Sequence, residues 1–192
     1  MKKRSKKKKK GKKKVLFFII LVGVILAILA LFQREIFYGL KSLPKKRGIP
    51  ETKRQVLLYF SDGEGEFLIG EKRKISKKGE VGEEAKEVIN ELIKGPRGGL
   101  IPTLPPRTRL LGLELGENGI AKVNFNHALS KDHPGGSSAE MMTVYSITNT
   151  LTDNFHQIKR VQILIEGETV ETIAGHLSIR EPVPPKRDLI KP

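Results

Sequence analysis

Three side chains that can bind metals or transfer protons lie close together in residues 126–136 (NHALSKDHPGG). His127, Asp132 and His133 offer the nitrogen and oxygen ligands that zinc and other transition metals accept. We expect a loop here, between a hairpin and a helix, so that no helical or strand period fixes the direction of either ring. The spacing therefore argues against a metal site, and we predict neither a metal nor another cofactor.

Two serines follow this cluster and could act as nucleophiles beside a histidine. However, the sequence has no G-x-S-x-G motif, which forms the nucleophile elbow of many hydrolases. Residues Ser137 to Glu140 (SSAE) instead match a capping box, so we expect Ser137 to cap a helix. We predict that the protein is not an enzyme. The alternative is an anchored envelope hydrolase or metal-dependent enzyme that uses the loop from His127 to Ser138.

A glycine-rich stretch at residues 95–99 (GPRGG) could in principle hold a phosphate. A phosphate loop opens a helix, because the free N–H groups and the positive end of the helix dipole must face the anion. This stretch follows a predicted helix, so these groups lie on the wrong side. We expect Gly95 and Pro96 to end the helix and to begin a flexible crossing.

Alternating strand and helix patterns position these residues in one domain, from about residue 55 to residue 182. Residues 55–60 (QVLLYF) are typical of a buried strand, and residues 67–75 are expected to be a less regular extended segment. Residues 83–94 place apolar side chains at helical spacing. Residues 98–107 contain three prolines, which exclude a central strand and predict a crossing.

The second half of the domain contains a hairpin, a helix and another hairpin. The three leucines of residues 111–115 alternate along one strand, residues 121–125 alternate along the next, and an Asn-Gly turn joins them. A helix from Ser137 and two strands within residues 159–173 follow. The resulting order, βαββαββ, predicts an α+β fold with two helices packed on one face of a mixed sheet.

This ordered set of features resembles the GerMN domain of sporulation and germination proteins, over about residues 55–182. The resemblance depends on Gly95 and Pro96 after the first helix, Pro102 in the crossing, Val123 in the hairpin and Gly167 after a strand. It implies structural roles for these residues. It also implies a non-enzymatic module outside the cytoplasm, similar in fold to the ring-building domains of secretion systems, that helps to assemble the bacterial cell envelope.

Residues Val15 to Phe32 are uncharged and almost wholly apolar. As a helix, they would extend about 27 Å, close to the roughly 30 Å hydrocarbon core of a bilayer, so we expect one transmembrane helix. The eleven Lys and Arg among residues 1–14 predict a cytoplasmic tail and an extracytoplasmic domain. A cleaved signal peptide is the alternative, but cleavage after Ala30 would place the bulky Ile28 at the minus-three position. We therefore expect a retained anchor.

The net charge of +15 comes from the N-terminal part of the chain. Residues 55–192 are close to neutral, and the basic tail lacks aromatic residues on which bases could stack, so we predict no nucleic-acid partner. Attraction of the tail to anionic lipid headgroups is expected instead. The chain has no cysteine, which excludes disulfides and a lipid-modified N-terminal cysteine.

The remaining segments complete the predicted organisation. Residues 33–54 are expected to be a linker, and residues 183–192 a proline-rich tail. Together, these features predict a binding or assembly module displayed outside the cytoplasmic membrane. We expect its partner to be an envelope protein or a second copy of the chain.

Overall fold

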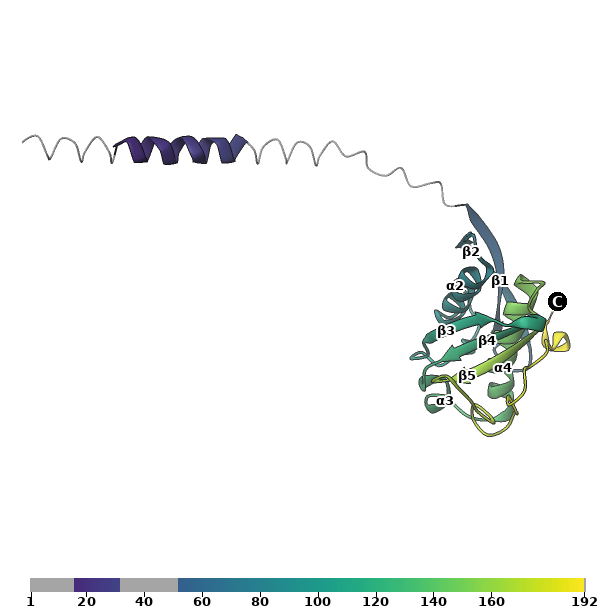
Figure 1. The fold of residues 1–192 in the computed structure, drawn as a ribbon. Helices are drawn as coiled ribbons and strands as arrows, with labels where there is room; N and C mark the ends of the chain where they lie inside the picture. Colours follow the sequence, from purple (N-terminus) through teal and green to yellow (C-terminus); the bar gives the residue numbers. More distant parts are fainter. Residues whose placement is uncertain (1–15, 32–51, 192) are drawn as a thin grey trace, which may run out of the picture. The chain divides into compact units, whose positions relative to one another are not determined.

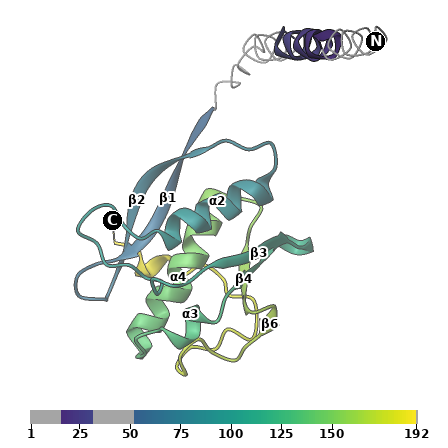
Figure 2. The ribbon, with the colours of Figure 1, turned by 90° about the vertical axis from the view of Figure 1, so that its left-hand side faces the viewer.

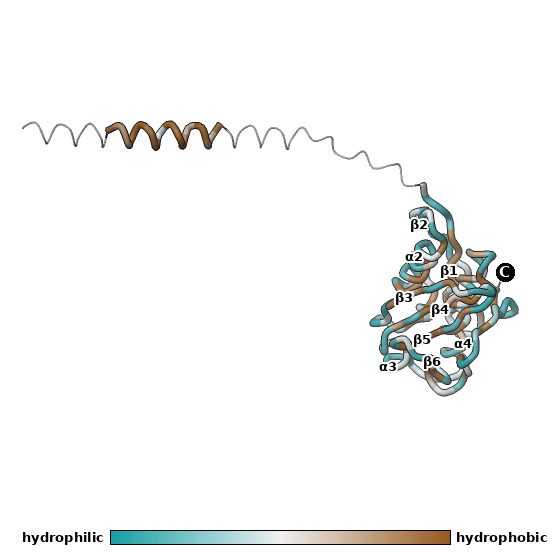
Figure 3. The backbone as a smooth tube through the Cα atoms, in the orientation of Figure 1, coloured by the Kyte–Doolittle hydropathy of each residue, from teal (hydrophilic) through white to brown (hydrophobic). Residues whose placement is uncertain are grey.

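The computed structural model describes residues 16–31 and 52–191, which belong to two separate units (Figure 1). Residues 16–31 form a helix whose residues are hydrophobic along almost its whole length (Figure 3). Among the described residues, no helix is long and apolar enough to cross a membrane. The expected span from Val15 to Phe32 is therefore not confirmed. The predicted tail 1–14 and most of the predicted linker lie outside the described residues.

The folded unit belongs to the α+β class, as the sequence predicts. In chain order its elements are β1 (Lys53–Ser61), β2 (Leu68–Ser76), α2 (Val81–Ile93), β3 (Leu110–Leu115), η1 (Glu117–Gly119), β4 (Ile120–Phe125), α3 (Ala128–Lys131), α4 (Ser137–Asn154), β5 (Arg160–Ile165), β6 (Glu168–Thr169) and η2 (Arg187–Leu189). The expected order βαββαββ is wrong at its start. The segment expected to be irregular is the nine-residue strand β2, which pairs with β1 along its whole length.

The strands form two sheets instead of the single sheet that the sequence predicts. β1 and β2 form an antiparallel pair, whereas β3, β4, β5 and β6 form a second sheet in that order. This second sheet is mixed, because β4 and β5 are parallel and the other neighbours are antiparallel. Both helices contact both sheets, and Figure 2 shows α2 and α4 between β1–β2 and β3–β4. The expectation that the helices cover one face of one sheet is therefore wrong.

The sheets separate because side chains of α4 occupy the second edge of β1. Asn154 accepts a hydrogen bond from the N–H of Leu57 at 3.0 Å and donates one to the carbonyl of Leu57 at 2.6 Å. Two residues along, the N–H of Tyr59 donates to the hydroxyl of Thr150 at 3.1 Å. With these backbone groups paired, this edge of β1 does not need another strand.

One hydrophobic core joins the two sheets and both helices. Leu92 from α2 and Val161 and Ile163 from β5 are buried in it, as their spacing predicts, whereas Ile93 is only partly buried. The core also contains, among others, Val56, Leu58, Phe60, Val88, Ile89, Val123, Phe125, Ile147 and Leu151.

The alternation of leucines along β3 is interrupted by a β-bulge between Leu110 and Gly112. A bulge adds one residue to a strand and so reverses the faces of the residues on either side. Leu110 consequently packs against the core, and Leu113 is buried. The three leucines that alternate along the expected strand therefore do not share one buried face, since Leu113 is buried whereas Leu111 and Leu115 are 48% and 40% exposed.

The turn between β3 and β4 forms as its Asn-Gly sequence predicts. Asn118 and Gly119 both have positive φ, at 61° and 74°. Glycine is needed at the second position, because a Cβ there would lie 2.8 Å from the carbonyl oxygen of Gln157. A positive φ is easily reached by glycine and less often by asparagine.

Candidate functional site

A groove of about 640 Å³ lies where the β1–β2 turn, the proline-rich crossing and the first turns of α4 meet. We call it the proline groove. It is lined by residues 61–65, 101–106 and 132–134 and by Ser138, Ala139, Met142 and Thr143. Sequence reasoning identified the crossing but treated it as a connection. The available sequence signal was an isoleucine, Ile101, within this proline-rich stretch, and the structure shows that it is half-exposed.

Hydrogen bonds attach the proline-rich crossing to β1 on one side and to α4 on the other. Ser61 and Ile101 exchange backbone hydrogen bonds of 3.1 and 2.9 Å, which continue the end of β1. The hydroxyl of Thr143 donates to the carbonyl of Thr103 at 2.6 Å, which ties the crossing to α4. The buried hydroxyl of Thr103 itself has no hydrogen-bond partner in the described part of the chain. The crossing that forms the groove is thus fixed in place on both sides.

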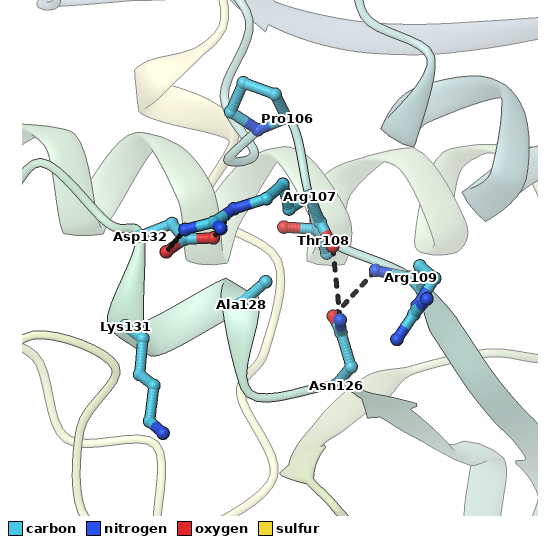
Figure 4. A pocket seen from close by; sticks show the side chains of 8 residues that line it. All are labelled: Pro106, Arg107, Thr108, Arg109, Asn126, Ala128, Lys131 and Asp132. Atoms are coloured by element: carbon cyan, nitrogen blue, oxygen red, sulfur yellow. Dashed lines mark hydrogen bonds and ion pairs between the residues drawn. The ribbon is translucent and has the colours of Figure 1, made fainter.

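A second hollow of about 500 Å³ adjoins the groove and shares Pro106 and Asp132 with it (Figure 4). We call it the basic pocket. Arg107 binds Asp132 through two hydrogen bonds, of 2.8 and 2.5 Å. In Figure 4 the side chains of Arg109 and Lys131 extend away from this pair. Sequence reasoning missed this pocket, because its cations come from segments more than twenty residues apart.

The side chain of Asn126 fixes the backbone at the floor of the basic pocket. Its Oδ1 accepts a hydrogen bond from the N–H of Arg109 at 2.8 Å, and its Nδ2 donates to the carbonyl of Arg107 at 3.1 Å. Asn126 directly follows β4, so the pocket is attached to the central part of the mixed sheet.

The structure does not bring His127, Asp132 and His133 together as a site. His127 is largely exposed, and its Nε2 lies 3.8 Å from a carboxylate oxygen of Glu166. Asp132 is held by Arg107, as described above. Within residues 16–31 and 52–191, no group of three His, Cys, Asp or Glu side chains could hold a metal ion.

His133 has a structural position instead. Its Nδ1 accepts a hydrogen bond from the N–H of Gly135 at 3.1 Å, and its Nε2 lies 3.0 Å from the hydroxyl of Thr143. Since Nδ1 is an acceptor, we assign the ring proton to Nε2. Burial lowers the pKa of His133 below its ordinary value, which favours this neutral form. The ring therefore braces the loop against α4.

The expected capping box at the start of α4 does not form. The cap position is Gly136, with φ 85°, and no side chain caps the helix there. Ser137 is the first helical residue, and Ser138 lines the groove. The two glycines before the helix allow the chain to enter it without a side-chain cap.

Glu140 is fully buried and binds a distant loop. Its carboxylate accepts hydrogen bonds of 2.8 Å from the N–H groups of Ile173, Ala174 and His176. Burial by itself raises the pKa of Glu140, but these backbone N–H donors lower it more, so that the pKa lies below its ordinary value. Glu140 is therefore a charged structural tie between α4 and the chain after β6.

The glycine-rich stretch 95–99 is occupied by a carboxylate of the protein itself. The N–H of Arg97 donates to Glu71 at 2.9 Å. Gly95 has a φ of 79° after α2, and Pro102 lies beside it, since a Cβ on Gly95 would be 3.8 Å from the Pro102 ring. Pro96 follows at once and is partly buried.

The other two motif residues lie in the mixed sheet and its last turn. Val123 is fully buried in β4. Gly167, with φ 88°, forms the turn between β5 and β6, and its N–H donates to the side chain of Asn124 at 2.7 Å.

Comparison with known families agrees with this architecture. Residues 57–171 match the family model Germane, described as sporulation and spore germination. The chain belongs to the Germane family. The match runs from the middle of β1 to the end of β6 and includes all the residues that line both hollows. A search of curated proteins found no match.

Several solved structures share this fold. A protein of Clostridium perfringens assigned as a lipoprotein is 27% identical, with a TM-score of 0.52 over 71% of this chain and 90% of that chain. The first GerMN domain of the sporulation protein GerM from Bacillus subtilis is 22% identical, with a TM-score of 0.53 over 72% and 98%. The tandem GerMN domains of GerM are 18% identical, with a TM-score of 0.54 over 71% of this chain and 48% of that one.

Proposed function

We propose that this Germane-family chain is a membrane-anchored binding module that helps to assemble envelope structures outside the cytoplasmic membrane and catalyses no reaction. The observation that carries the binding role is the proline groove, a preformed hollow of about 640 Å³ with apolar walls. Hollows of about 300–1,000 Å³ with mostly apolar walls and a few polar groups are typical of binding sites.

The anchor is proposed from the sequence. Residues Val15 to Phe32 carry no charge and follow a strongly basic tail, which favours a single span with the N-terminus inside. The similar Clostridium perfringens protein is assigned as a lipoprotein, which would also be held at a membrane surface. This chain has no cysteine to carry a lipid, so a retained apolar helix would have to replace that attachment.

The non-catalytic role is supported by the engagement of the candidate catalytic side chains elsewhere. Asp132 pairs with Arg107, and His133 is held between Gly135 and Thr143. His127 extends toward Glu166. Asp132, His133 and Ser138 all line the groove, but none of the three candidate side chains forms a hydrogen bond with a serine hydroxyl in the described part of the chain.

Protease treatment of intact cells tests the topology. We expect added protease to remove the folded domain and to leave the basic tail attached to the membrane. Protection of the domain until the cells are lysed would contradict the proposed location.

Crosslinking of the full-length chain in its own membranes tests the binding role. We expect Ile101→Asp to remove the crosslinked partner, because a charge would enter an apolar wall of the groove. Leu111→Asp is the matched control, since Ile101 and Leu111 are both 48% exposed and Leu111 lies outside the groove. Equal crosslinking by both variants would contradict a partner site in the groove.

A further inference from the structure

The proline groove has acidic side chains at one end. Asp62 and Glu64 lie in the β1–β2 turn that forms this end. One carboxylate oxygen of Asp62 accepts hydrogen bonds from the N–H groups of Glu66 and Phe67, at 3.0 and 3.3 Å. Glu64 is exposed and Asp62 is mostly buried, and neither acid forms an ion pair in the described part of the chain. Burial raises the pKa of Asp62, but the backbone N–H donors and, less strongly, the positive charge of Lys191 lower it more, so that the pKa lies below its ordinary value and the carboxylate stays charged. This end of the groove therefore carries negative charge that a bound cation could neutralise.

The basic pocket adjoins the groove at Pro106 and Asp132 and carries the opposite charge. Three of its lining residues, Arg107, Arg109 and Lys131, are cationic, and Asp132 alone is anionic. Because Arg107 pairs with Asp132, the net charge of the pocket comes from Arg109 and Lys131. Both are exposed, and neither forms an ion pair within residues 52–191. Figure 4 shows them directed away from the neutralised pair.

The walls between these two ends are apolar and poor in backbone donors. Pro102, Pro105 and Pro106 have no N–H group, so this crossing cannot form a regular ladder with an added strand. Ile101 provides exposed apolar surface, whereas Met142 and the hydroxyl of Thr103 are almost completely buried beneath the groove. A bound segment would therefore be held mainly by its side chains.

We propose that the proline groove and the adjoining basic pocket together bind an extended segment of a partner protein. Its apolar residues would lie in the groove, a basic residue at the Asp62–Glu64 end, and an acidic residue beside Arg109 and Lys131 in the basic pocket. The occupant is identified by charge complementarity with two ends of opposite sign. Such complementarity sets the register and excludes wrongly placed partners more than it adds affinity. This inference depends on the proposed binding function and specifies its ligand.

Selection from a random library of twelve-residue peptides on the full-length chain tests this inference. We expect enriched peptides to carry Lys or Arg on one side of an apolar stretch and Asp or Glu on the other. Arg109→Glu combined with Lys131→Glu should replace the acidic preference by a basic one. Glu64→Lys should reverse the preference at the other end. Each reversal is expected to change the affinity of a selected peptide by about threefold or more, as for partly exposed ion pairs.

Matched variants distinguish a local effect from a change in overall charge. At exposed positions of the β3–β4 hairpin, Glu117→Lys makes the same charge change as Glu64→Lys, and Lys122→Glu makes the same change as each single substitution of the double variant. We expect them to leave the selected pattern unchanged. Enriched peptides without opposite charges, a pattern that ignores the groove variants, or no enrichment at all would overturn the proposal. If Ile101→Asp still removed the crosslinked partner, the binding function would stand and only the charge-directed register would fail.

Discussion

Glu140 shows how one buried carboxylate organises a distant loop. We predict that Glu140→Gln lowers the free energy of unfolding by about 2 kcal/mol, because a charged acceptor of three backbone N–H groups becomes neutral and loses one acceptor oxygen. Urea denaturation at pH 7 measures this loss. Glu171→Gln is the control, since Glu171 is exposed and forms its contacts at the surface. Equal effects of the two substitutions would contradict the role of Glu140.

The same residue predicts a dependence of stability on acid pH. The pKa of Glu140 is lower in the folded chain than in the unfolded chain. Its contribution is therefore present above the unfolded pKa of about 4.3 and is lost as the pH falls through the folded pKa. Denaturation curves between pH 6 and pH 3 should show a smaller loss of stability for Glu140→Gln than for the wild type. Parallel losses would contradict this assignment.

His127 and His133 are predicted to differ despite their proximity in sequence. His133→Ala should cost about 1 kcal/mol, because it leaves Gly135 and Thr143 without a hydrogen-bond partner in the ring, whereas His127→Ala should have almost no effect. Since burial lowers the pKa of His133, its contribution is lost as the pH falls below about 6.5 toward the folded pKa. Thermal unfolding at pH 7.5 and pH 5.5 measures both effects. Equal behaviour of the variants would show that His133 is not part of the packing.

The helix α4 is unusual because many of its buried residues are polar. The hydroxyls of Thr148 and Thr152 donate to carbonyls one turn earlier in the helix, at 2.9 Å each. Other polar side chains of α4 form hydrogen bonds with neighbouring segments. The helix can therefore be enclosed on several sides while its buried polar side chains remain hydrogen-bonded. This arrangement explains why a single apolar stripe, which is typical of a helix on one sheet face, is weak here.

Two asparagines of α4 pair with the backbone of distant segments, and Asn154 thereby takes the place of a strand beside β1. Asn154 pairs with the N–H and the carbonyl of Leu57, as described above. Asn149 pairs in the same way with the N–H and the carbonyl of Lys186, through hydrogen bonds of 2.9 Å each. We predict that Asn154→Ala or Asn149→Ala lowers the free energy of unfolding by about 2–4 kcal/mol, because each leaves two backbone groups unpaired. Urea denaturation measures this cost, with the exposed Asn90→Ala as the control. A loss below that of the control would contradict the pairing.

The folded unit has its own core and is predicted to be independent of the rest of the chain. We expect residues 50–192 alone to unfold in one cooperative transition, because one core joins both sheets and both helices. Calorimetry should give equal calorimetric and van't Hoff enthalpies. A chelator should not change the transition temperature, since the described residues form no metal cluster. Two separate transitions, or a large shift in chelator, would contradict this prediction.

The amino-acid sequence alone determined the features that depend on neighbouring residues. The α+β class, the position of α2, the Asn-Gly turn and the resemblance to the GerMN domain all follow from local periods and turn residues. These signals are reliable because a helical or strand period and a positive φ are set within a few residues.

Only the tertiary structure decided the features that depend on distant partners. The bulge at Leu110 turns Leu111 outward, and Asn154 replaces a strand beside β1, which divides the expected sheet in two. The proline groove and the basic pocket likewise combine segments that are far apart in the chain. Which side chain pairs with the edge of a strand, and which loops meet around a hollow, are both set by the packing of the whole domain. Neither feature therefore leaves a local period in the sequence.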